Sequence, residues 1–236
     1  MKKIYTLILA IALIVPATYA QKGLSIGGNG MSLSSAIVNQ NSWGNGHEYD
    51  FKATFAPSFG FDIGYNFNDN VGIYTGYWFN KLGQRYKDDY DGSNWARDIE
   101  LKYQMIPIML KFTGSQTRVN FVGGIGILYA MLKEGNQTWT RDGEPWTENT
   151  DTHTDLGASD VTDRFVSSDI IFNLELGARI ILMDNLYIDA TMNFGYGLKD
   201  INDENWHTPD SDGTYNASHN AYGGFKVGIA YVLFGE

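Results

Sequence analysis

The sequence has 236 residues, 43% hydrophobic and 14% aromatic, with 27 glycines, no cysteine and a net charge of −10. This composition excludes a disordered tail, and the lack of cysteine excludes disulfides, thiolate metal sites and cysteine nucleophiles. A chain this acidic neutralises few phosphates, so no nucleic acid partner is expected, and abundant glycine and aromatic residues favour one large all-β domain.

The first twenty residues have the pattern of a secretory signal peptide. Lys2 and Lys3 form a basic start, residues 4–15 are apolar, and Thr18-Tyr19-Ala20 forms a cleavage site with small residues at its two ends. The apolar run is shorter than the roughly 18 residues that a membrane-spanning helix needs. We therefore expect residues 1–20 to be removed and residues 21–236 to form a single exported domain.

We predict that the mature protein begins at Gln21, because cleavage follows the small residue Ala20. N-terminal sequencing of protein extracted from membranes measures this directly. A chain that still carries Met1 would contradict export, and with it the membrane assignment developed below.

The remainder of the chain alternates with a period of two, which predicts β-strands. Apolar residues occupy every second position in 53–67, 119–131 and 170–182, with small or polar residues between them. Taking all such runs together, we predict eight strands, at 22–35, 52–67, 71–87, 98–113, 118–133, 166–182, 186–198 and 220–234.

The connections between these strands alternate in length. Short turns are expected at 68–70, 114–117 and 183–185, and long polar loops at 36–51, 88–97, 134–165 and 199–219. In an up-and-down barrel this order places every long loop at one end and every short turn at the other. The sequence therefore predicts an all-β, eight-stranded antiparallel up-and-down transmembrane β-barrel in the bacterial cell outer membrane, with outer-membrane lipid as its first partner.

A soluble lipocalin-like ligand binder is the structural alternative, because its eight strands also alternate. Such a barrel would turn a charged, hydrated face to solvent. Here the polar positions are mostly Gly, Ser, Asn and Thr, which suit a crowded interior, while the apolar positions carry Phe and Tyr, as a lipid-facing wall does. The membrane barrel is favoured.

Several segments resemble the PorT-like outer-membrane β-barrel family. The most specific is residues 101–112, with Ile106-Pro107 at its centre. Glycine and aromatic patterns at 60–83, 123–126 and 188–201 are similar to the same family. The resemblance implies an eight-stranded barrel of the OmpA/OmpX-like type. It also implies a protein without a defined activity or, as in a few members, an accessory part of protein secretion.

Charged residues among the polar positions of the strands predict a network inside the barrel. An eight-stranded barrel is just wide enough for its side chains, so charges within it are expected to pair. Lys111 joins the others only if its strand shifts phase at Pro107. A salt-bridged lumen is favoured over an ion or proton pathway, because four acids balance four bases. The predicted network is Asp62, Glu100, Lys102, Lys111, Glu175, Arg179, Asp189 and Lys226.

The four histidines all lie in predicted long loops: His47, His153, His207 and His219. Acidic residues are close to them in sequence, but no metal-binding spacing such as His-Glu-x-x-His occurs, and no Gly-x-Ser-x-Gly motif is present. We therefore expect no catalytic residue, no metal and no cofactor. A loop-borne metal-dependent or hydrolytic enzyme is the functional alternative.

Tryptophans mark the loops as a candidate recognition surface. Trp139, Trp146 and Trp206 lie among small polar residues, where exposed aromatic rings commonly bind partners. The same rings could instead pack the loops together or anchor at lipid headgroups. The sequence thus favours a non-enzymatic barrel whose acidic loops bind an unidentified macromolecular partner or serve protein secretion.

Overall fold

The computed structural model of the protein describes residues 22–39, 50–52, 54–90, 92–114, 118–146, 158–207, 209 and 213–234. The predicted signal peptide and two of the histidines, His47 and His153, lie outside these ranges. No helix within them is long and apolar enough to span a membrane.

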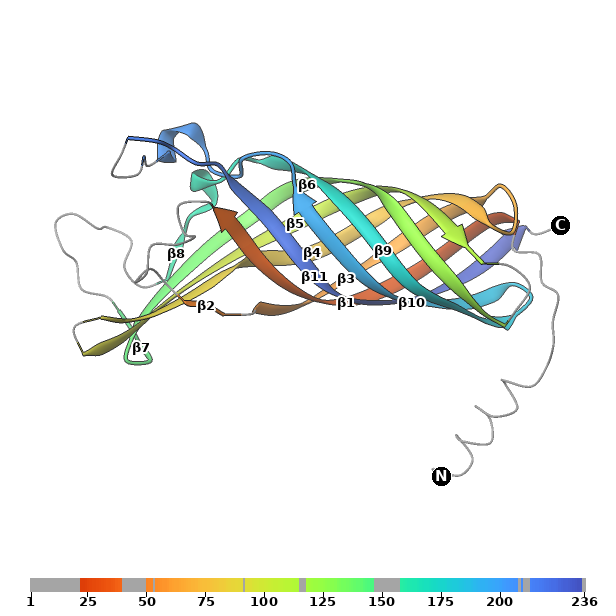
Figure 1. The fold of residues 1–236 in the computed structure, drawn as a ribbon, viewed down its shortest axis with the longest axis horizontal. Helices are drawn as coiled ribbons and strands as arrows, with labels where there is room; N and C mark the ends of the chain where they lie inside the picture. The colour runs from red at the N-terminus through yellow and green to blue at the C-terminus, as the bar shows by residue number, and fades with distance from the viewer. Residues whose placement is uncertain are drawn as a thin grey trace, which may run out of the picture.

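One antiparallel sheet closes on itself into a barrel (Figure 1). Neighbours in sequence are neighbours in the wall, β1 pairs with β11, and β4 pairs with both β3 and β5, so the predicted eight-stranded ring is confirmed. Its strands are β1 (Gly23–Asn39), β3 (Thr54–Asn66), β4 (Val71–Tyr90), β5 (Ser93–Thr113), β6 (Val119–Arg141), β9 (Ser168–Met183), β10 (Leu186–Gly197) and β11 (Ser218–Phe234).

Short strands and helical turns lie at the loop end of the barrel. β2 (Asp50–Lys52) pairs with β4, and β7 (Glu144–Pro145) and β8 (Ala158–Asp160) pair with β6. Two single turns of 3-10 helix, η2 (Thr162–Arg164) and η3 (Glu204–Trp206), lie in the connections before β9 and β11. An isolated bridge between Phe165 and Asn202 joins these two connections.

Alternate side chains of every strand point away from the barrel axis. Those that form the outer wall are mostly apolar. Phe59, Phe121 and Phe225 are 62%, 61% and 65% exposed, respectively, although they are large apolar residues. Exposure of this kind around a whole barrel is costly in water and favourable in lipid. The alternation that predicts the strands therefore also supplies the membrane-facing surface.

Three strands continue beyond the apolar band, and the predicted loop at 88–97 is wrong. Instead, β4 and β5 form a hairpin with Tyr90 opposite Ser93, and its turn contains Gly92 with a φ of 74°. Similarly, β6 runs to Arg141 rather than to residue 133. The charged residues of these extensions are typical of loop sequence, but here they form cross-strand ion pairs such as Arg85–Asp98, at 2.7 Å.

We call the extended part of these strands the projecting sheet: residues 81–90 of β4, 93–102 of β5 and 134–141 of β6, with β7 at its edge. In Figure 1 it extends to the left, past the ends of the other strands, and the C-terminal end of β11 lies at the opposite end of the barrel. The projecting sheet is therefore a direct continuation of the barrel wall, made by the same three strands.

The interior has two layers. The loop-side layer is a hydrophobic cluster that includes Leu33, Leu82, Ile99, Leu101, Tyr103, Met105, Leu128, Ala130, Leu132, Ile171 and Ile201. We call it the apolar plug. The layer nearer the short turns is polar and charged, and Lys111, Glu175 and Lys226 are at most 4% exposed there. The interior is therefore filled by apolar packing as well as by the ion pairs that the sequence predicts.

Candidate functional site

Six of the eight predicted lumen charges lie together in the polar layer, which we call the charged layer. They come from five strands, and three are acidic and three basic, so their formal charges cancel. The six are Asp62 on β3, Lys111 on β5, Glu175 and Arg179 on β9, Asp189 on β10 and Lys226 on β11. A balanced set is expected here, because an unpaired charge at such burial is strongly destabilising.

Arg179 and Asp189 form the tightest pair. Nε of Arg179 donates to Oδ1 of Asp189 at 2.7 Å, and Nη2 donates to Oδ2 at 2.9 Å. The guanidinium carbon lies 3.8 Å from the centroid of the Tyr187 ring. A two-pronged pair stacked on an aromatic ring fixes the guanidinium plane. Because Arg179 is only 1% exposed, solvent weakens this pair little.

The lysines make looser contacts. Nζ of Lys111 lies 3.2 Å from Oε1 of Glu175, which also accepts a hydrogen bond from Thr191 at 2.9 Å. Nζ of Lys226 lies 3.4 Å from Oδ2 of Asp62. The charged layer is thus one continuous network with both tight and loose members.

Aromatic and amide side chains, whose residue types carry no charge that marks them in the sequence, complete the charged layer. Asp62 accepts hydrogen bonds from Trp78 Nε1 at 2.7 Å and from Asn29 Nδ2 at 2.9 Å. The ammonium of Lys226 lies 4.1 Å from the Trp78 ring centroid. The signal that could identify Trp78 and Asn29 is their position, because both lie at inward positions in the alternation of their own strands, β4 and β1.

Glu100 and Lys102 are not part of the lumen, so that prediction is wrong. No phase shift occurs at Pro107: odd-numbered residues of β5 face inward from Leu101 to Lys111, and even-numbered ones face outward. At the level of the plug the inward residues of β5 are apolar and the outward ones are charged or polar. This is the reverse of the membrane-spanning part, where apolar residues face outward. Lys111 is therefore inside without any shift.

Glu100 and Lys102 instead lie on the outer face of the projecting sheet. Nζ of Lys102 lies 2.7 Å from Oε1 of Glu134 and 3.8 Å from Oε1 of Glu100. Nζ of Lys81 lies 3.3 Å from Oε2 of Glu100. The hydrogen bond with Glu134 raises the pKa of Lys102, and that bond together with one from Asn136 lowers the pKa of Glu134. These side chains are 37–46% exposed, so the ion pairs act on a hydrated surface.

Two of the three candidate recognition tryptophans meet, and a third ring joins them. Trp146 lies 4.6 Å from Trp95 and 6.5 Å from Trp139, measured between ring centroids. The guanidinium carbon of Arg97 lies 5.3 Å from the centroid of the Trp139 ring, and that of Arg141 lies 5.2 Å from the centroid of the Trp95 ring. We call these five residues the tryptophan–arginine cluster.

Trp206 lies apart from this cluster. It is in η3, on the connection between β10 and β11, where the guanidinium of Arg164 lies 4.4 Å from its ring. Its side chain is 45% exposed. The predicted set of three tryptophans therefore divides into a pair on the projecting sheet and a separate ring on another loop.

The described histidines make stacking contacts. His207 stacks on Tyr215 at 3.8 Å, and its Nε2 lies 3.2 Å from Oδ2 of Asp200. Tyr215 donates to the same oxygen at 2.7 Å, and burial together with this bond raises the pKa of Tyr215 to about 12. His219 stacks on Tyr196 at 5.4 Å. Within the described ranges, no group of three or more His, Asp or Glu residues could hold a metal ion.

Several solved structures of other proteins are similar to this chain. The structure is similar to Neisserial surface protein A, with 13% identity, coverage of 91% of this chain and 99% of that one, and a TM-score of 0.48. It is also similar to Ail, the attachment invasion locus protein of Yersinia pestis, with 13% identity, coverage of 89% and 99%, and a TM-score of 0.41. A third similar structure is the outer membrane protease OmpT from Escherichia coli, with 9% identity, coverage of 92% and 99%, and a TM-score of 0.37.

Among curated proteins, no sequence matches this chain. The family model of the outer membrane protein beta-barrel domain, however, matches residues 6–232, which is nearly the whole sequence. Together with the closed ring of strands and the apolar outer wall, this match identifies the kind of protein. The chain belongs to the outer membrane protein β-barrel domain family and is a β-barrel protein of the bacterial outer membrane.

Proposed function

We propose that this protein is a non-enzymatic outer-membrane barrel that uses the projecting sheet to bind a macromolecular partner outside the cell. A filled interior supports a scaffold rather than a channel. A projecting sheet that continues the barrel strands offers a partner a preformed surface, so little conformational entropy is lost on binding.

The observation that carries the proposal is the difference between the two faces of the projecting sheet. Its outer face carries cross-strand ion pairs such as Arg85–Asp98. On the face that continues the inward side of the strands, Arg97 donates two hydrogen bonds to Oε1 of Gln137, at 2.9 and 2.6 Å. Arg97 belongs to the tryptophan–arginine cluster through its contact with the Trp139 ring. Tryptophan and arginine are the residue types that most often dominate binding energy at protein interfaces.

An accessory role in protein secretion is the second setting for the same surface. It rests on the resemblance of residues 101–112 to the PorT-like group. A role in secretion and a role in attachment at the cell surface have the same structural requirement. Each needs a rigid surface outside the lipid, and the projecting sheet is the part of the protein suited to it.

We predict that replacing Trp95, Trp139 and Trp146 together by alanine weakens partner capture at least tenfold, because hot-spot residues each contribute about 2 kcal/mol or more. Capture is measured by crosslinking and pull-down from intact cells. The matched control is Trp206→Ala, which removes an exposed tryptophan outside the cluster and should leave capture unchanged. Heat-dependent gel mobility verifies that each variant still forms a barrel.

Two results would contradict the proposal. One is that the triple variant captures as wild type does while Trp206→Ala loses capture. The other is a hydrolytic activity of the purified barrel that His207→Ala or a chelator abolishes, since that would favour a loop-borne enzyme.

A further inference from the structure

Lys226 is buried without a close hydrogen-bond partner. Its side chain is 2% exposed, and its Nζ makes no hydrogen bond to the described residues. The nearest carboxylate oxygens are 3.4 Å away on Asp62 and 3.6 Å away on Glu175. Charge-assisted N–H···O bonds are usually about 2.7–2.9 Å long. Arg179 reaches its carboxylate at 2.7 Å in the same charged layer, and Lys111, at 3.2 Å from Glu175, still makes a hydrogen bond that Lys226 lacks.

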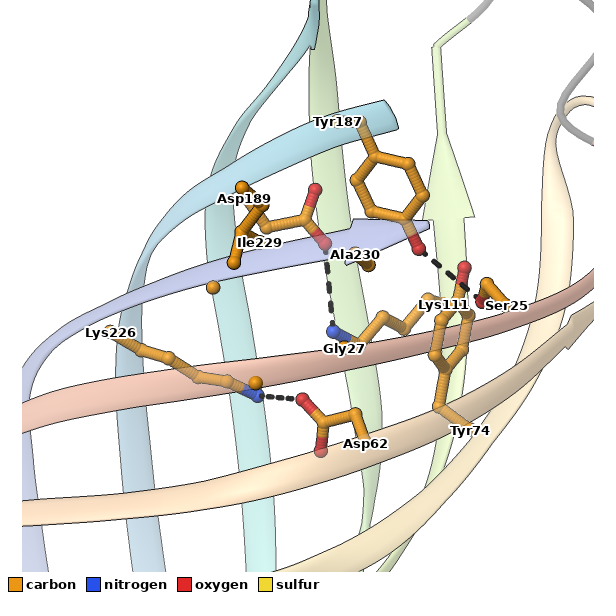
Figure 2. Close-up of a pocket in the computed structure, with 12 residues that line it drawn as sticks. Ser25, Gly27, Asp62, Tyr74, Lys111, Tyr187, Asp189, Lys226, Ile229 and Ala230 are labelled. Atoms are coloured by element: carbon orange, nitrogen blue, oxygen red, sulfur yellow. Dashed lines mark hydrogen bonds and ion pairs between the residues drawn. The ribbon is translucent and has the colours of Figure 1, made fainter. Parts of the chain in front are cut away.

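A small cavity lies next to this ammonium group (Figure 2). It has a volume of about 20 Å³, and the polar groups that line it include Ser25, Asp62, Lys111, Asp189 and Lys226. A water molecule needs roughly 10–15 Å³ of such space and two to four polar partners. The cavity therefore has the size for a single water molecule and the lining that such a molecule needs.

We propose that this cavity binds one ordered water molecule, which accepts a hydrogen bond from Lys226 and donates to the carboxylates of Asp62 and Asp189. Water is the ligand that the charges favour. The six charged residues of the layer already balance, so a trapped ion would leave one charge uncompensated. A neutral molecule that both donates and accepts completes the layer without changing its charge.

The bound water also explains why the lysine can lie away from its carboxylates. A buried ammonium loses its hydration, and long ion pairs alone restore only part of that stabilisation. A bridging water restores a hydrogen bond at little cost in entropy. Since the apolar plug lies on the loop side, this water exchanges with solvent by way of the short-turn end of the barrel.

Diffraction from crystals of the full-length mature barrel, grown with and without sodium bromide, tests the proposal directly. The expected result is a density peak about 2.8 Å from Nζ of Lys226, with no anomalous signal in bromide. An empty cavity, or a direct Lys226–Asp62 bond of ordinary length, would overturn it. An anomalous bromide peak would overturn it too, because the ligand would then be an anion.

A pair of glycine substitutions tests the same inference in solution. Gly228 lines the cavity, and a Cβ there would meet Gly28 O at 3.4 Å and Asn29 Cβ at 3.5 Å, which are ordinary contacts. Gly30, on the outer face of β1, has nothing within 4 Å of the position that a Cβ would take, and it is the matched control. Both changes to alanine restrict the unfolded chain equally.

If the cavity holds water, Gly228→Ala displaces it and leaves Lys226 without its partner. The thermal unfolding midpoint in detergent should then fall below that of Gly30→Ala. If the cavity is dry, the added methyl group fills a void, and Gly228→Ala should be at least as stable as the control. That second result would overturn the proposal even if both variants fold well.

Discussion

Replacing Arg179 by alanine is expected to lower the free energy of unfolding by about 3–5 kcal/mol, because it leaves the buried carboxylate of Asp189 without its closest partner. Arg179 is 1% exposed and makes two hydrogen bonds to that carboxylate. Urea titration of the barrel in detergent, followed by tryptophan fluorescence and by heat-dependent gel mobility, measures the change.

The matched control is Arg85→Ala on the projecting sheet. Arg85 and Asp98 are also 2.7 Å apart, but their side chains are 47% and 45% exposed. Water replaces a lost partner there, so we expect a loss of about 1 kcal/mol or less. The double variant Arg179→Met with Asp189→Asn removes both charges and should recover most of the stability. An unchanged midpoint for Arg179→Ala alone would show that β9 does not turn this residue inward.

The second large effect concerns ion conduction. We expect the wild-type barrel to show no steady conductance in planar bilayers, and we expect the apolar plug, not the charged layer, to be the main barrier. Replacing Leu101, Leu128 and Ile171 by serine makes the plug smaller and more polar, so water can enter it. Single-channel recording should then show discrete conductance that wild type lacks.

The charge-neutral double variant at Arg179 and Asp189 is the comparison, and it should stay closed. Heat-dependent gel mobility must show that the serine variant still folds, since each truncated core residue costs about 2–5 kcal/mol. Conductance in the charge-neutral variant together with a closed serine variant would assign the barrier to the charged layer. Steady conductance in wild type would contradict the filled interior itself.

The strands could be predicted from sequence because a lipid-facing wall forces strict alternation. Phe59, Phe61 and Ile63 are exposed at alternate positions of β3, and this periodicity needs no knowledge of the partner strands. The loop-end extensions of β4 to β6 lack that signal. Beyond the lipid both faces of a strand can be polar, so the sheet there is revealed only by cross-strand pairings such as that of Arg85 with Asp98.

The sequence predicts that a balanced set of charges lies inside the barrel, but it does not predict correctly every residue of that set. Glu175, Arg179 and Asp189 alternate along β9 and β10 with outward residues that are apolar, so their direction follows from alternation. Glu100 and Lys102 follow the same rule and lie outside, because the inward positions of β5 next to them are Leu101 and Tyr103 of the plug. The meeting of Trp95 with Trp146 depends on how β6 pairs with β5 and with β7, which a single sequence does not contain.

Closure of the ring by β1 and β11 has a consequence for the order of assembly. Lys111, Glu175, Arg179 and Asp189 lie on β5, β9 and β10, so they can come together while the sheet is still open. Asp62 on β3 and Lys226 on β11 are separated by β1 and meet only when the first and last strands pair. Their contact is therefore a late event in membrane insertion. Until it forms, Lys226 lacks its nearest carboxylate and Asp62 lacks its lysine, and their attraction favours closing the barrel in the correct sense.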